Sequence, residues 1–186
     1  MLGCVVHAST ACPEPGLVQH KFGDTFMIGE PDGSLSARSK KVADMLAQAG
    51  FKTVHSAQIR YEIWYKLWGN MTMNPISAIT GATGDKILAG PLVKAFCSAV
   101  MVEAAAVGAR IGCPIPHQPE DRHAITATLG AFKTSMLQDV EAHRPIELDA
   151  IVGAAYEIAQ RLNIPTPNMA ALLGLTRLFA QQKQLY

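Results

Sequence analysis

The pattern of hydrophobic residues changes near residue 56, and this change limits the possible folds more than any other feature of the sequence. Before it, β-branched and aromatic runs at residues 4–10, 17–20 and 25–28 are separated by the turn-forming sequences Pro13-Glu-Pro15-Gly16 and Phe22-Gly23-Asp24, which predicts a meander of strands. After it, apolar residues recur at helical spacing. The sequence therefore predicts a mostly α protein, with a small α/β unit at residues 1–55 and an all-helical domain at residues 56–186.

Caps and prolines set the expected limits of the individual elements. Residues 36–49 predict a helix that ends at Gly50, and residues 51–55 predict one more strand. In the second part, we expect helices at residues 59–74 (ending before Pro75), 89–111, 119–139, 148–162 and 169–184.

Charge and hydropathy exclude several classes of protein. Sixteen basic and fifteen acidic side chains give a net charge of +1, without the clustered positive field that a nucleic-acid or anionic-membrane binder needs. No uninterrupted apolar run approaches the roughly 18 residues of a membrane span; the most apolar stretch, residues 95–107, is broken by Ser98 and Glu103. We therefore expect a soluble protein. Charged residues make up only 17% of the chain, against about 25% in typical domains, which favours a surface that is partly covered in an oligomer.

The cysteine, histidine and glycine patterns limit which disulfides, metal sites and phosphate-binding loops the chain can have. The four cysteines form no Cys-x-x-Cys pair and the chain starts without a signal peptide, which favours reduced thiols in the cytoplasm. The six histidines lack metal-ligand spacing, so no metal site is expected. Neither Gly-x-Gly-x-x-Gly nor Gly-x-x-x-x-Gly-Lys occurs, so the chain has no recognisable phosphate-binding loop.

A polar stripe runs along the otherwise apolar helix expected at residues 59–74. Lys66, Asn70 and Asn74 recur at i, i+4 and i+8 and share one face. Buried amides and ammonium groups are costly unless they are paired, so the stripe predicts either an internal polar network or a ligand cleft. Two simpler interpretations stay open: a salt bridge between Lys66 and Glu62, and a helix-ending role for Asn74.

A second polar segment runs from Thr134 to Asp149. Ser135 begins it, and Glu147 follows a helix break near the start of the next helix. The simpler interpretation makes Glu147 or Asp149 an acid of the first helical turn, stabilised by the helix dipole, with Asp139 paired to Arg144. The sequence alone leaves both interpretations open.

Together these segments resemble ketopantoate reductase (2-dehydropantoate 2-reductase). The resemblance is carried by Ile59-Arg60-x-Glu62-Ile-Trp64-x-Lys66-Leu67-x-x-Asn70-x-x-x-Asn74-Pro75-x-x-Ala78-x-Thr80-Gly81, by Ser135-Met-Leu-Gln-Asp139 with Glu147-Leu-Asp149, and by Gly153 and Ile164-Pro-Thr-Pro167. It implies a helical C-terminal domain like that of 6-phosphogluconate dehydrogenase. It also implies that residues 1–55 are the end of a Rossmann-type NADP-binding domain.

The resemblance further implies an activity. The family reduces ketopantoate to pantoate with NADPH, on the route to pantothenate and coenzyme A. It implies that Lys66 is the general acid. Asn70 and Asn74 would bind the hydroxyl and carbonyl edge of the substrate, and Ser135 its carboxylate. Glu147 would be the second catalytic residue and would contact the substrate hydroxyl and the nicotinamide side of the cofactor. A cytoplasmic homodimer acting on a small 2-oxo acid is expected.

Two departures from the family leave alternatives open. Gly84 replaces an asparagine that some members carry after the Thr-Gly segment, so the substrate could be another branched 2-oxo acid. The glycine-rich beginning of the family's nucleotide-binding domain has no counterpart, which predicts a truncated chain with little activity by itself. A non-catalytic helical assembly module is the third possibility.

Overall fold

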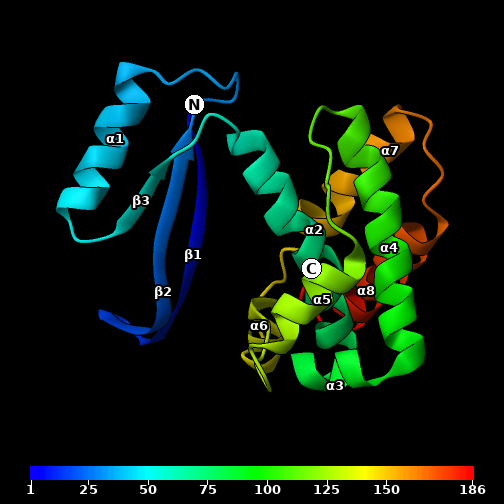
Figure 1. The fold of residues 1–186 in the computed structure, drawn as a ribbon. Coiled ribbons are helices and arrows are strands. Elements are labelled where there is room, and N and C mark those ends of the chain that lie inside the picture. The colour runs from blue at the N-terminus through cyan, green and yellow to red at the C-terminus, as the bar shows by residue number, and fades with distance from the viewer. The chain divides into compact units, whose positions relative to one another are not determined.

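The computed structural model describes residues 1–186 and consists of two compact units, Met1–Lys66 and Leu67–Tyr186. The first unit contains β1 (Gly3–Glu14), β2 (Leu17–Gly29), α1 (Ala37–Gln48), β3 (Lys52–His55) and the start of α2 (Ile59–Thr80), as Figure 1 shows. The second contains the rest of α2, then α3 (Gly84–Ala89), α4 (Pro91–Arg110), α5 (Pro119–Ala127), α6 (Ser135–Glu141), the π-helix η1 (Asp149–Gly153), α7 (Ala154–Arg161) and α8 (Pro167–Gln182). The predicted fold class is confirmed. The functional boundary at residues 55 and 56 stays a prediction.

The three strands form one sheet in the order β1-β2-β3. β1 and β2 are antiparallel and turn at Pro15 and Gly16, as expected, whereas β3 runs parallel to β2 after α1. The prediction of short separate strands was wrong, because the sequence around Gly23 does not end a strand. Gly23 has φ +76° and lies inside β2, where the pairing with β1 shifts register. Glycine adopts this conformation readily, so the turn signal produces an irregularity in a long ribbon.

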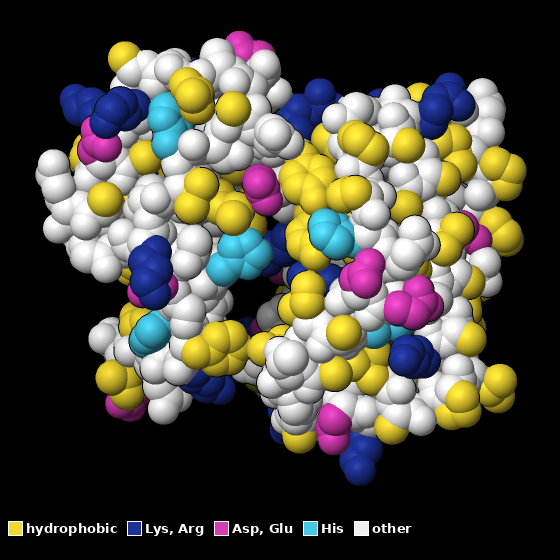
Figure 2. Space-filling view, in the orientation of Figure 1, with side chains coloured by type: hydrophobic (Ala, Val, Ile, Leu, Met, Phe, Trp, Pro, Cys, Tyr) yellow, Lys and Arg dark blue, Asp and Glu magenta, His cyan; other side chains and the backbone are white.

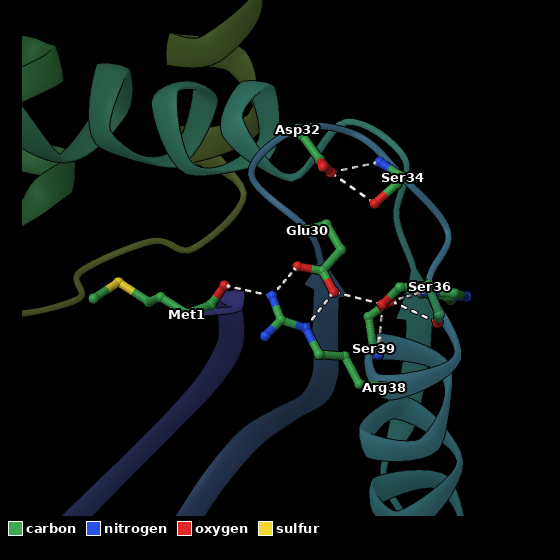
Figure 3. A network of polar contacts seen from close by, with 8 residues as sticks. Met1, Glu30, Asp32, Ser34, Ser36, Arg38 and Ser39 are labelled. Carbon is green, nitrogen blue, oxygen red and sulfur yellow. Dashed lines mark hydrogen bonds and ion pairs between the residues drawn. The ribbon is translucent and has the colours of Figure 1, made fainter.

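A buried carboxylate joins the end of β2 to the start of α1 (Figure 3). Glu30 is 5% exposed at its side chain and accepts hydrogen bonds from Arg38 Nε at 2.7 Å and Ser36 Oγ at 2.5 Å. The Arg38 guanidinium, followed by the Ser36 hydroxyl, lowers the pKa of Glu30 to about 2. Ser36 also caps α1 by accepting the backbone N–H of Ser39. The helix therefore starts where the sequence predicts.

Helix α4 contacts α3, α5, α7 and α8 in the second unit. By length and composition it is apolar enough to cross a membrane, although 33% of its most apolar window is buried inside the unit. The sequence has no uninterrupted apolar run of this length, and α4 meets the criterion through its mean hydropathy. A single such helix is weak evidence of a membrane span, since core helices of soluble proteins have the same composition. Its fully buried side chains are those of a core: Cys97, Val100, Met101, Ala104 and Val107.

Helix α2 does not stop at Pro75 but continues to Thr80. A proline inside a helix removes one backbone hydrogen bond, here the one to the carbonyl of Met71. Every residue from Met71 to Ala78 is buried, so packing on all sides holds this segment helical despite the proline. The predicted end at residue 74 was wrong because tertiary burial outweighs the local signal.

Three further helix predictions need correction. The single helix expected at residues 119–139 is two helices, because Gly130 adopts φ +63° and Thr134 caps a new helix by accepting the N–H of Leu137. The helix expected from residue 89 is preceded by the short α3, and α4 starts after Gly90. The helix expected from residue 148 begins as the π-helix η1, a form that occurs frequently at functional sites.

Candidate active site

Two amides of the predicted polar stripe lie in the second unit without partners. Asn70 is partly exposed and Asn74 is 5% exposed, and the side chain of neither makes a hydrogen bond within the chain. Neither amide is among the buried polar atoms that lack a partner, so both reach solvent, where a ligand can accept hydrogen bonds from them or donate hydrogen bonds to them. Asn74 cannot be a helix-ending residue, because α2 continues beyond it.

Lys66 lies one helical turn before Asn70, at the end of the first unit. Its Nζ donates a hydrogen bond to the backbone carbonyl of Val6 on β1 at 2.6 Å. The simpler interpretation of this lysine, a salt bridge with Glu62, stays a prediction. Burial raises the pKa of the nearby Cys4 thiol, and the positive charge of Lys66 partly opposes that effect. The ammonium is thus held beside β1 and shares a helix with the two free amides.

Ser135 is the first residue of α6, and its position is fixed relative to Asn74. Thr134, the residue before it, exchanges a hydrogen bond with Ser77 Oγ, and Ser77 Oγ also donates to the carbonyl of Asn74 at 2.9 Å. The start of α6 is therefore fastened to α2 one turn after Asn74. The Ser135 hydroxyl is exposed and has no partner within the chain. The structure brings Asn74 and Ser135 into one neighbourhood, and Ser77 and Thr134 are the residues that do so.

The loop before α6 also packs against Gly84. The N–H of Gly84 donates to the carbonyl of Phe132 at 3.0 Å. A Cβ added to Gly84 would lie 2.1 Å from Cε1 of the Phe132 ring, so the ring occupies the space that any side chain at position 84 would need. The glycine noted in the sequence as a departure is thus matched by an aromatic residue 48 positions later, a pairing that no local pattern reveals.

Glu147 is placed by its backbone alone. It is exposed, its side chain makes no hydrogen bond within the chain, and no contact joins it to Asn70, Asn74 or Ser135. Two residues later, Asp149 pairs with Arg177 at 2.7 Å and accepts the hydroxyl of Tyr186 at 2.5 Å. The Tyr186 hydrogen bond, followed by that of Arg177, lowers the pKa of Asp149.

The simpler interpretation of the second polar segment is thus partly confirmed. Asp139 pairs with Arg144 at 2.8 Å, as that interpretation proposed. Asp149 is an ion-pair partner, whereas Glu147 remains without one. Of the two acids, only Glu147 has no side-chain partner within the chain.

Comparison with known proteins places this arrangement in a family. The family model described as "Ketopantoate reductase PanE/ApbA C terminal" matches residues 58–180, two thirds of the chain. The chain belongs to the ketopantoate reductase family. The match includes every candidate residue, from Lys66 to Glu147.

Individual relatives extend the likeness to the first unit. The 2-dehydropantoate 2-reductase of Mesorhizobium japonicum is 39% identical over all 186 residues, which are 57% of its own length. A solved structure from Ralstonia solanacearum MolK2, assigned as a ketopantoate reductase, is 52% identical with a TM-score of 0.95, and the chain covers 56% of it. D-mandelate dehydrogenase in complex with NADH and anilino(oxo)acetate has the same fold, with 22% identity, a TM-score of 0.86 and 61% of its length covered. The chain thus spans less than two thirds of the length of these relatives.

The residues present in this chain do not fit the phosphate part of a nicotinamide dinucleotide. Such phosphates bind at a glycine-rich turn before a helix N-terminus. The N-terminus of α1 is occupied instead by Ser36 and by the carboxylate of Glu30 (Figure 3). Ser36 already caps this N-terminus, and Glu30 is paired there with Arg38, so α1 offers no open site for a phosphate.

Proposed function

We propose that this chain is the substrate-binding part of an NADPH-dependent 2-dehydropantoate 2-reductase. The observation that carries the proposal is the pair of unpartnered amides on α2, Asn70 and Asn74, with Ser135 fastened beside them through Ser77 and Thr134. This arrangement offers hydrogen bonds to a small polar molecule inside a domain of the matching family.

The proposed chemistry adds a hydride to C2 of the 2-oxo acid and a proton to its carbonyl oxygen. A reduced nicotinamide, when bound, would supply the hydride, and residues 1–186 would bind the substrate and supply the proton. Lys66 Nζ donates that proton as negative charge develops on the oxygen, so the alcohol forms and the lysine becomes neutral. Asn70 and Asn74 hold the carbonyl edge and the hydroxyl of ketopantoate, Ser135 its carboxylate, and Glu147 its hydroxyl on the nicotinamide side.

The cofactor phosphates are bound outside residues 1–186 in this proposal. Residues 1–55 then form the last part of the NADP-binding domain, and residues 56–186 form the domain for substrate binding and dimerisation. Four free cysteines agree with a cytoplasmic location.

A homodimer would cover apolar groups on the second unit, on which Figure 2 shows scattered hydrophobic side chains. On α4, Leu92 is 85% exposed and Val102 58%, and on the neighbouring α8, Leu175 is 61% exposed and Leu178 54%. Sedimentation equilibrium tests the dimer: we expect a mass near twice that of the chain, and a monomer at micromolar concentration would contradict it.

The alternative of a purely structural assembly module is tested by ligand titration. In such a module, ketopantoate and NADPH would leave the fluorescence of Trp64 and Trp68 unchanged.

The activity is tested on a completed enzyme, defined as residues 1–186 preceded by the nucleotide-binding part of the Ralstonia solanacearum relative. We expect ketopantoate-dependent oxidation of NADPH, followed as loss of absorbance of the reduced nicotinamide. The isolated 186-residue chain is the matched control and should show little or no turnover. A completed enzyme that folds and binds NADPH but reduces no 2-oxo acid would contradict the proposal.

A second candidate is reduction of another branched 2-oxo acid. The observation in its favour is the packing of the Phe132 ring over Gly84, where some family members have an asparagine. An apolar ring offers no hydrogen bond to a substrate hydroxyl. Comparison of kcat/KM for ketopantoate with values for hydroxyl-free 2-oxo acids distinguishes the two candidates.

A further inference from the structure

The last two residues of the chain hold the segment that carries Glu147. On one side of Glu147, the N–H of Ile146 donates to the carbonyl of Leu185 at 2.9 Å. On the other side, the hydroxyl of Tyr186 donates to Asp149 Oδ2 at 2.5 Å. Ile146 and Leu185 are 7% and 2% exposed, so the first of these contacts is buried.

Arg177 of α8 completes the contact at Asp149. Its Nη2 donates to Asp149 Oδ1 at 2.7 Å, so both carboxylate oxygens of Asp149 are engaged. Its guanidinium also lies 5.7 Å from the centre of the Tyr186 ring. Charge-assisted hydrogen bonds of this kind fix geometry as well as contribute free energy.

Glu147 needs such external support. Its own side chain has no partner within the chain, and the residues before it, Arg144 and Pro145, belong to no helix or strand. The residues after it enter the π-helix η1, and its carbonyl accepts the N–H of Ile151 at 3.1 Å. The place of its Cα and the direction of its Cα–Cβ bond are therefore set by the backbone on both sides of it.

We infer that Tyr186, Arg177 and Asp149 are positioning residues that aim Glu147 at the substrate hydroxyl. The inference rests on the proposed function, because it takes the role of Glu147 from there. Positioning of a binding group matters strongly, since a displacement of about 1 Å can reduce catalysis by roughly 10²-fold.

The test compares two substrates that differ by one hydroxyl, ketopantoate and 3,3-dimethyl-2-oxobutanoate, in the completed enzyme. In Tyr186→Phe we expect kcat/KM for ketopantoate to fall about tenfold, the scale of one hydrogen bond to a charged group, mainly through KM. The hydroxyl-free substrate should change by less than about twofold, because it makes no hydrogen bond to Glu147. Tyr156→Phe, which removes a hydroxyl without a partner in the chain, is the matched control and should affect neither substrate.

A double-mutant cycle shows whether Tyr186 acts through Glu147. The variant Glu147→Gln should itself remove most of the preference for the hydroxyl, and adding Tyr186→Phe should change it no further. Equal losses for both substrates, or additive effects in the double variant, would overturn the inference and leave a purely structural contact.

Two further outcomes keep the inference and the proposed function separate. If Tyr186→Phe does not fold, Arg177→Lys provides the same comparison, because it keeps the charge and loses the forked geometry. If the unmodified completed enzyme turns over neither substrate, the proposed function is wrong, and the inference that rests on it is wrong too. If the ratio of kcat/KM for ketopantoate to kcat/KM for 3,3-dimethyl-2-oxobutanoate is small and the same in all variants, the inference is wrong but the proposed function stands.

Discussion

Glu103 provides a direct test of how the helical unit is held together. It lies on α4, and its carboxylate accepts three hydrogen bonds from the start of α8: the backbone N–H of Asn168 at 2.9 Å, the side-chain amide of Asn168 at 2.7 Å and the backbone N–H of Met169 at 2.8 Å. Thr166, at the N-cap position of α8, makes no capping hydrogen bond. Glu103 therefore caps a helix more than sixty residues away in the sequence.

The cost of removing this cap follows from the groups that lose their partners. Glu103→Ala removes a helix cap, a loss of about 0.5–2 kcal/mol. It also leaves the N–H of Met169, a fully buried residue, without an acceptor, which costs about 1–3 kcal/mol. We expect the free energy of unfolding to fall by about 3 kcal/mol in total, and Tm by roughly 6–12 °C for a chain of this size. Glu103→Gln keeps one oxygen acceptor and should lose about half as much.

Thermal and urea unfolding of the 186-residue chain, followed by circular dichroism, measure this loss. Glu157→Gln is the matched control, because Glu157 pairs only with Arg161 and both side chains are more than 60% exposed. Such surface pairs contribute about 0–1 kcal/mol, so the control should unfold close to the unmodified chain. If Glu103→Ala unfolds at the same midpoint as the control, the cap is not stabilising and the reasoning is refuted.

Three other outcomes are expected from the same structure. The Arg38 guanidinium lowers the pKa of Glu30 to about 2 from its ordinary 4.5, so the stabilisation that ionised Glu30 contributes is complete above pH 4.5 and is lost as the pH falls towards 2. In acid titrations, the difference in stability between the unmodified chain and Glu30→Gln should therefore shrink over that range. A constant difference would contradict this. Gly84→Ala should lower stability by about 1–3 kcal/mol because Phe132 must move, whereas Gly174→Ala, with open space around its Cβ in α8, should be neutral or stabilising; equal unfolding midpoints would rule out the clash. Cys97, whose thiol pKa is raised to about 11 by burial, should resist alkylation in the native protein and react after unfolding, and rapid native labelling would contradict its burial.

The sequence was sufficient wherever a short-range signal decides the structure. Ser36 and Gly50 limit α1 because a cap and a left-handed residue act on their own helix. The spacing of Lys66, Asn70 and Asn74 predicts a shared helix face, and all three do lie on α2. The predicted site residues depend on the family resemblance for their roles, and those roles remain predictions.

The sequence was insufficient where long-range contacts decide. Pro75 signals a helix end, but burial of the surrounding turns keeps α2 intact. The hydrogen bond between Ser77 and Thr134 joins residues 57 positions apart, and that between Asp149 and Tyr186 joins residues 37 positions apart. Neither periodicity nor turn chemistry records which distant residues meet, so these contacts could be found only in the folded chain.

The central claim, that α2 presents a proton donor and amides to a 2-oxo acid, is tested most directly by Lys66→Ala in the completed enzyme. General acid catalysis contributes about 10²–10⁴-fold, so kcat for ketopantoate should fall by about 10²-fold or more while NADPH binding is retained. Lys40→Ala, which removes an exposed lysine paired with Asp44, is the control and should leave kcat unchanged. A Lys66→Ala enzyme with unchanged kcat would show that this lysine has a structural role, such as its hydrogen bond to Val6, and the account of the active site would be wrong.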